Sequence, residues 1–294
     1  MRDALDAVVD QLGGLDPRLA ALALLLHVTN HLLRSLAWRN VLASAFPAQR
    51  LGLLPVASAY ATGVALNAVA PARGGDAAKI ALARAAIPES NVATIAATLS
   101  VLVLFDMVMA TVLVLVVATA GLVPLSLPSA SWWPLALAAV AIAGVAGWML
   151  ARRARSLWSR LRQGGAILRT PSRYLRQVAL VQSAAWACRV GVIVCLLAGF
   201  GLPASIPTAA VVMILCGAST LVPLTPGGAG TQQVMVALAL SQTASAAAVV
   251  SFSVAMQAGV TLVNALLGLA GAMAAFGTLR PLTALRAARA AARA

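Results

Sequence analysis

Long apolar stretches separated by short polar segments extend over most of this 294-residue chain. An α-helix needs about 20 apolar residues to cross the hydrocarbon core of a bilayer. Several of the stretches reach that length, and the sequence therefore predicts an all-α, polytopic helical integral membrane protein. The predicted spans cover about 19–33, 92–120, 134–150, 178–200 and 246–276.

Two further apolar stretches, at about 51–87 and 206–242, are each broken by proline and glycine. Backbone groups freed by such a break cannot face lipid, so they lie inside the protein or line a wet cavity. The helical segment after the first break, 77–86, is too short to cross a bilayer, and each stretch is predicted to be a re-entrant helical hairpin. The residues of the breaks are Pro71, Gly74, Gly75, Pro226, Gly227, Gly228 and Gly230.

The distribution of charge orients the predicted spans. Basic residues cluster in 151–177 and 278–294, whereas 121–131 and 201–206 carry no charge. Because arginine and lysine mark the cytoplasmic side of a membrane protein, the hairpins are predicted to enter from opposite sides, as in transporters with inverted repeats. The predicted parts of this single transmembrane domain, 1–294, are an external amphipathic segment 1–17, a first repeat 18–150, a cytoplasmic loop 151–177, a second repeat 178–277 and a cytoplasmic tail 278–294.

The net charge of +14 has to be interpreted together with the 62% share of hydrophobic residues. In a soluble protein such a charge would indicate a nucleic-acid partner. In a membrane protein the arginines instead fix the topology and attract anionic lipid head groups. We expect a multi-pass protein of the cell membrane (inner or plasma membrane), with its N-terminus outside, its C-terminus in the cytoplasm and no nucleic-acid partner.

The first break brings three charged residues, Arg73, Asp76 and Lys79, into apolar surroundings. Each charge inside a membrane costs about 2.5–3.5 kcal/mol on insertion scales, so such groups usually face a cavity and pair with one another. Helical spacing places Asp76 and Lys79 on one face. Either Arg73 and Lys79 bind a lipid phosphate, with Asp76 orienting them or contacting a cationic head group, or the three form an ion-pair cluster that holds the hairpin together.

Other charged residues in or beside the apolar stretches are further candidates. Asp106 lies in the middle of a predicted span, where it is either a proton-coupling site or the ion-pair partner of an arginine such as Arg189. Arg34 and Arg39 follow the first apolar run together with Trp38. The two arginines either guide anionic head groups or anchor the helix at the inner membrane boundary.

Amide and imidazole side chains complete the candidates. Asn67 and the Pro-Gly-Gly motif are predicted to shape the backbone, because glycine permits tight turns and close approach. Gln233 either contacts the substrate or forms hydrogen bonds with the broken backbone. His27 and His31 have the spacing of metal ligands on a helix, but no carboxylate or cysteine cluster accompanies them in the sequence. We expect no metal and no cofactor.

Several motifs are shared with a known family: Arg34 with Trp38-Arg39, the first break from Asn67 to Lys79, Asp106, and Pro226-Gly-Gly-x-Gly230. With them the chain resembles, over nearly its whole length, the transmembrane domain of lysylphosphatidylglycerol synthases and its stand-alone, flippase-like relatives. The resemblance implies a domain that moves aminoacylated lipid between leaflets, while a separate soluble domain carries out the aminoacylation. The chain departs from the family pattern at Asp76 (Glu in the family), Lys79 (Arg), Gln233 (an acid) and Leu102-Val103 (Glu-Arg).

These observations favour a lipid flippase that moves a phospholipid or polyprenyl-linked head group through a central polar cavity. The ligands expected are anionic or aminoacylated phospholipids or polyprenyl-phosphate lipids, and the protein partners expected are a second copy or an envelope enzyme. An alternative is a non-transporting lipid-binding or scaffold subunit of an envelope lipid-modifying system. A membrane enzyme acting on lipid fits less well, because the sequence has only two histidines and no plausible Ser–His–Asp set. We expect that the chain is not an enzyme.

Overall fold

The computed structural model describes residues 16–69, 74–87, 90–119, 155–219, 230–240 and 244–276. All regular structure in these ranges is helical, which confirms the predicted all-α class for this part of the chain. Several sequence predictions lie outside the described residues. They concern the segments 1–15, 120–154 and 277–294 and the residues Pro71, Arg73, Pro226, Gly227 and Gly228.

In the described ranges, four helical segments are long and apolar enough to cross a membrane. At 1.5 Å per residue, a helix of such length exceeds the roughly 30 Å of a hydrocarbon core. Large apolar side chains are exposed along them, for example Leu104, Met107 and Val108, as expected for a multi-pass membrane protein. The segments are α2 (Pro17–Ala45), α5 (Val92–Thr119), the continuous α8 (Pro171–Tyr174), η3 (Leu175–Ala179) and α9 (Leu180–Gly199), and α12 (Ala246–Phe276).

Helix α2 begins where its sequence predicts but ends later. The Asp16 carboxylate accepts the Arg18 N–H at 2.8 Å, and proline occupies the first helical position. The helix then continues past the first apolar run to Ala45. Trp38 consequently lies inside the protein with no exposed surface, and its Nε1–H donates to Thr98 Oγ1 at 3.0 Å. Trp38, which the sequence groups with Arg34 and Arg39 near a predicted membrane boundary, thus points into the protein, where α5 supplies its polar partner. Its position relative to the membrane stays a prediction.

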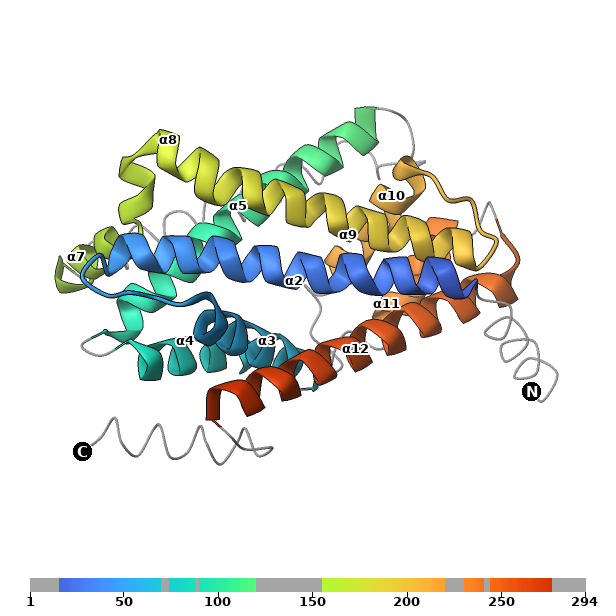
Figure 1. Cartoon of the computed structure of the whole chain (residues 1–294). Helices are drawn as coiled ribbons and strands as arrows, with labels where there is room; N and C mark the ends of the chain where they lie inside the picture. Colours follow the sequence, from blue (N-terminus) through green and yellow to red (C-terminus); the bar gives the residue numbers. More distant parts are fainter. Residues whose placement is uncertain are drawn as a thin grey trace.

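The two broken stretches form two pairs of short helices. The first helix pair is α3 (Leu53–Val69) with α4 (Gly74–Ala86), and the second is α10 (Ile206–Ser219) with α11 (Thr231–Leu240). The two helices of each pair pack against each other. Figure 1 shows the pairs toward opposite ends of the long helices. Their insertion into a membrane as re-entrant hairpins stays a prediction.

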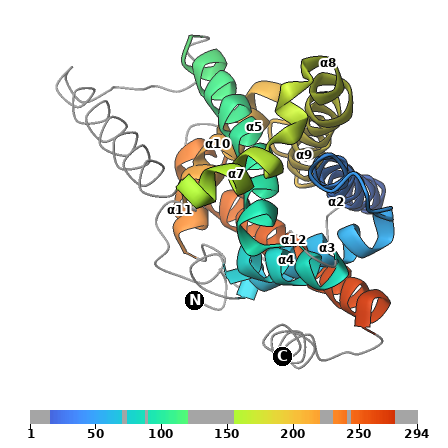
Figure 2. The same cartoon turned by 90° about the vertical axis from the view of Figure 1, so that its left-hand side faces the viewer.

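The basic segment lies at the end of the molecule that holds the first helix pair (Figures 1 and 2). It contains α7 (Arg155–Gly164) and η2 (Ala166–Arg169), followed by α8. Gln163 attaches it to α2 by donating its Nε2–H to the Ala45 carbonyl at 3.0 Å. The exposed arginines of this segment are Arg160, Arg162, Arg169, Arg173 and Arg176.

Two clusters of buried apolar side chains form most of the core. The first cluster joins α2, the first helix pair and the beginning of α5, and the second joins α9, the second helix pair and α12. Tyr60 belongs to the first cluster and Trp186 to the second. These two residues also belong to one polar network, so the polar site connects the two clusters.

Candidate functional site

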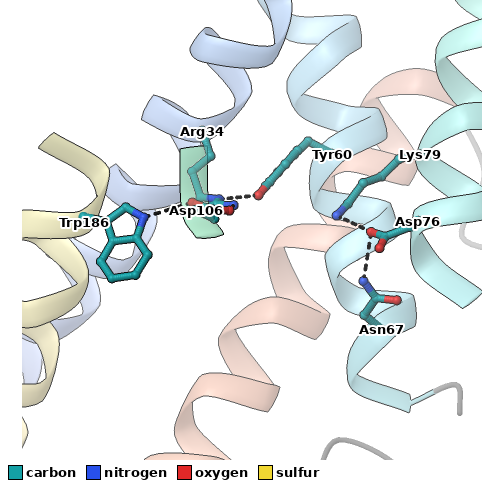
Figure 3. A network of polar contacts seen from close by, with 7 residues as sticks. All are labelled: Arg34, Tyr60, Asn67, Asp76, Lys79, Asp106 and Trp186. Carbon is teal, nitrogen blue, oxygen red and sulfur yellow. Dashed lines mark hydrogen bonds and ion pairs between the residues drawn. The ribbon is translucent and has the colours of Figure 1, made fainter. Parts of the chain in front are cut away.

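An ion pair between α2 and α5 forms the centre of the polar network. Arg34 donates from Nη2 to Asp106 Oδ2 at 2.5 Å and from Nη1 to Asp106 Oδ1 at 3.1 Å. The Trp186 Nε1–H donates to the same Oδ1 at 2.9 Å (Figure 3). The two charged side chains are only 17% and 26% exposed. This two-pronged geometry is the strong form of an arginine–carboxylate contact.

Asp106 therefore has an arginine partner from another helix, as one of the two alternatives predicts, but this arginine is not the candidate Arg189. Asp106 pairs with Arg34, and the Arg189 guanidinium lies over the Trp186 ring, 5.8 Å from its centroid. The continuation of α2 to Ala45 explains the difference, because it places Arg34 within the helix, where it faces the middle of α5. Arg39 has a separate role, donating from Nε to the Leu51 carbonyl at 2.9 Å and so holding the α2–α3 connection.

Tyr60 connects this ion pair to the first helix pair. Its hydroxyl accepts the Arg34 Nε–H at 2.6 Å, and its ring lies 4.7 Å from Lys79 Nζ, a cation–π distance. Sequence reasoning missed Tyr60 and Trp186. One signal was available for Tyr60, which is one of only two tyrosines in the chain and lies within an apolar stretch.

A second set of polar contacts joins α3 to α4. Lys79 Nζ donates to Asp76 Oδ1 at 2.8 Å, and Asn67 Nδ2 donates to the same oxygen at 3.3 Å. Asn67 Oδ1 also accepts the Gly75 N–H at 2.8 Å, so this side chain pairs a backbone group at the start of α4. Lys79 is nearly buried, with 9% of its side chain exposed, whereas Asp76 is 46% exposed. The predicted proximity of Asp76 and Lys79 is thus present, with Asn67 as an additional partner (Figure 3).

Close backbone packing fixes the position of these groups. A Cβ atom on Gly63 would lie 2.6 Å from the Gly75 carbonyl oxygen, and one on Gly75 would overlap the Gly63 carbonyl oxygen. Only glycine at both positions allows this approach. The contact brings α4 close enough to α3 for Lys79 to lie beside the Tyr60 ring.

The second helix pair is closed by neutral groups. Gly230 adopts a positive φ of 86°, which glycine tolerates best, and its N–H donates to Gln233 Oε1 at 2.6 Å. Gln233 is the third residue of α11, and it binds the Gly230 N–H as the glutamate or glutamine of a capping box binds the N–H of the N-cap residue. Gln233 Nε2 also donates to Gln257 Oε1 of α12. One of the two roles predicted for Gln233, hydrogen bonding at the broken backbone, is present in the structure, and contact with a substrate stays a prediction.

The two histidines meet α12 rather than a cluster of ligands. His27 Nε2 and His31 Nε2 lie 2.9 and 2.8 Å from Asn264 Oδ1, and 3.2 Å from each other. Among the described residues, no group of three or more His, Cys, Asp or Glu could hold a metal ion. One amide oxygen can accept from both imidazoles, so hydrogen bonding alone accounts for this arrangement.

Comparison with known proteins places the chain in a family. The family model described as Lysylphosphatidylglycerol synthase TM region matches residues 4–268, which is most of the chain. The match includes every candidate residue discussed above. Searches of curated proteins and of solved structures give no match.

Proposed function

We propose that the chain is a flippase that moves lipid head groups between membrane leaflets, because it belongs to the lysylphosphatidylglycerol synthase TM region family and carries a charged network among its long apolar helices. The family points to a membrane protein linked to lipid handling. The finer proposal is transport of a phospholipid or a polyprenyl-linked head group. In this proposal the chain is not an enzyme.

One observation carries the proposal: the charged contacts run from the first helix pair, through Tyr60, to Arg34 and Asp106. Charges inside a membrane are costly and mark substrate or ion pathways. A phosphate can replace a carboxylate beside an arginine or lysine without leaving the cation unpaired. The network is therefore suited to accept an anionic head group in exchange for one of its own carboxylates.

The proposed mechanism uses the two helix pairs as the ends of a pathway. The head group enters sideways between helices while its acyl or polyprenyl chains remain in lipid. If the pairs belong to inverted repeats, movement of one repeat against the other opens the site to each leaflet in turn. The arrangement of the pairs toward opposite ends of the long helices supports this mechanism (Figure 1).

The proposal is tested by reconstituting the protein into phosphatidylcholine vesicles that contain a minor share of fluorescent phosphatidylglycerol. A membrane-impermeant quencher then measures how fast labelled lipid leaves the inner leaflet. We expect Lys79→Gln to abolish the protein-dependent movement, because it removes the cation between Asp76 and Tyr60. Arg176→Gln, which changes an exposed arginine of the basic segment, is the matched control and should retain the movement.

Arg73→Ala is the parallel test for the residue at the first break that lies outside the described ranges. Wild-type movement of lipid in both Arg73→Ala and Lys79→Gln would remove the proposed role of this break. Binding of lipid by the wild-type protein without any movement would instead favour the lipid-binding or scaffold alternative. A new lipid product after incubation with the protein would indicate an enzyme.

A further inference from the structure

Arg189 occupies an unusual place on α9. The residues one turn before and after it on the same face, Trp186 and Ile193, are buried, as are Gln182 and Val192. Arg189 itself is exposed. An exposed side chain in the middle of an otherwise buried helix face lies over a local gap in the packing. The gap is within the protein, because lipid-facing residues of a helix occur on the opposite side from its buried face.

The electrostatic surroundings of Arg189 lead to the same location. Its guanidinium lies over the Trp186 ring, 5.8 Å from the ring centroid, and the Trp186 Nε1–H donates to Asp106 of α5 at 2.9 Å. Because Trp186 is buried, the Arg189 side chain lies beside the polar network rather than on the lipid-facing side of α9. Its exposure at this place indicates a hollow beside Trp186 that water can reach.

The charge of this hollow selects its ligand. Asp106 already accepts hydrogen bonds from Arg34 and Trp186, and within the described residues no carboxylate lies at ion-pair distance from Arg189. The described charges of the network are the cations Arg34, Lys79 and Arg189 against the carboxylates Asp76 and Asp106. This surplus of positive charge attracts an anion and disfavours a metal cation beside the neighbouring histidines.

We propose that Arg189 is the anion-binding residue of this hollow and that its ligand is a phosphate group, held by the planar fork of the guanidinium. The Trp186 ring supports the guanidinium from one side, and the N–H groups, which donate to no side chain in the described ranges, can bind two phosphate oxygens. The inference rests on the proposed function, since it names the part of the lipid that the pathway would recognise. The phosphate comes either from a phospholipid head group or from free inorganic phosphate.

Thermal unfolding of the detergent-solubilised full chain tests the proposal. A ligand that binds only the folded protein raises the unfolding midpoint in proportion to its affinity. We expect short-chain phosphatidylglycerol to raise the midpoint of the wild-type protein. In Arg189→Gln the affinity derived from this rise should fall at least about tenfold, the effect of losing one charged, two-pronged hydrogen bond. Arg176→Gln should retain the rise.

The midpoint without ligand separates binding from a structural role. Among the described residues Arg189 has no carboxylate partner, so the midpoint of ligand-free Arg189→Gln should stay close to that of the wild type, whereas loss of a structural contact would lower it clearly. Arg189→Lys, which keeps the charge but not the fork, should bind more weakly than wild type. A lowered ligand-free midpoint with an undiminished lipid-induced rise in Arg189→Gln, or no rise in the wild type with either ligand, overturns the proposal.

The source of the phosphate is distinguished by repeating the titration with inorganic phosphate. A rise with phosphatidylglycerol alone assigns the site to the lipid head group, and an equal rise with inorganic phosphate assigns it to the free anion. Failure of this proposal is distinct from failure of the proposed function. Vesicles in which Arg189→Gln still moves and binds lipid would refute the site only, and an Arg189-dependent rise without lipid movement would refute transport only.

Discussion

In both helix pairs a backbone N–H beside the break needs a hydrogen-bond acceptor, and different side chains supply it. In each pair an amide oxygen accepts the N–H of a glycine at the beginning of the second short helix: Asn67 accepts from Gly75, and Gln233 accepts from Gly230. In the first pair the amide belongs to the other helix and also contacts Asp76, so the closure is charged. In the second pair the amide belongs to the helix that directly follows the glycine, and its Nε2–H donates to the neutral side chain of Gln257.

The difference shows that the beginning of a short helix beside a break can be closed without charge. A neutral amide is sufficient for the N–H of Gly230, the described residue at the beginning of α11. The charges of the first pair therefore have another reason to be present. In the proposed function that reason is the binding of an anionic head group, because Tyr60 connects these charges to the Arg34–Asp106 pair. In the proposed pathway, we interpret the first pair as the one that contacts the head group with charged side chains and the second as its uncharged counterpart.

The largest effect is expected from breaking the Arg34–Asp106 ion pair, to which the first helix pair is connected. Asp106→Ala leaves the mostly buried Arg34 guanidinium without its carboxylate and should lower the free energy of unfolding by about 3 kcal/mol. Unfolding by SDS in mixed micelles measures the change. Asp76→Ala is the matched control, because Asp76 is 46% exposed, and it should cost less than about 1 kcal/mol. Equal losses in the two variants would contradict the deeper position of Asp106.

A second variant pair compares packing in the two helix pairs. Gly75→Val forces side-chain atoms into the Gly63 backbone and should cost about 2–3 kcal/mol. In Gly217→Val of α10 the added Cβ meets no atom of the described residues within 4 Å, so its cost should be much smaller. The same SDS unfolding measures both. Similar stability of the two variants would show that close backbone contact is no special feature of the first pair.

The two amide contacts should also differ in strength. Asn67→Leu leaves the N–H of buried Gly75 without an acceptor and should cost about 1–2 kcal/mol. Gln233→Leu should cost less, because Gly230 is exposed and its N–H can bind water instead. Amide hydrogen exchange at Gly75 and Gly230, followed by mass spectrometry, locates each loss. A larger cost for Gln233→Leu would reverse the comparison.

The smallest effect concerns the connection between the first pair and the central ion pair. Tyr60→Phe removes the acceptor of the Arg34 Nε–H but keeps the ring beside Lys79, and it should cost about 1 kcal/mol. In a double-mutant cycle with Asp106→Asn, the two changes should couple by about 0.5–1 kcal/mol. In a second cycle, which combines Gln233→Leu with Asp106→Asn, the two changes in the free energy of unfolding should be additive. Additivity in both cycles would separate the first pair from the ion pair.

Much of the local structure was predictable because it depends on neighbours in the sequence. Proline and glycine ended the apolar runs near the ends of α3 and α10, and helical spacing placed Asp76 beside Lys79. The bounds of α12 agree with the predicted span 246–276. Helix α2 was predicted too short, since the polar residues after its apolar run were interpreted as a membrane boundary although they are paired within the protein.

The sequence by itself determined that this is a helical membrane protein with two interrupted stretches and which of them carries charge. Only the tertiary structure decided the partners: Arg34 pairs with Asp106 across 72 positions, and the two histidines meet Asn264 across more than 230. The physical reason is that spacing along one helix fixes which of its residues share a face. Which helix that face meets, and at what height, depends on packing contacts such as Gly63 against Gly75, which helical periodicity does not reveal.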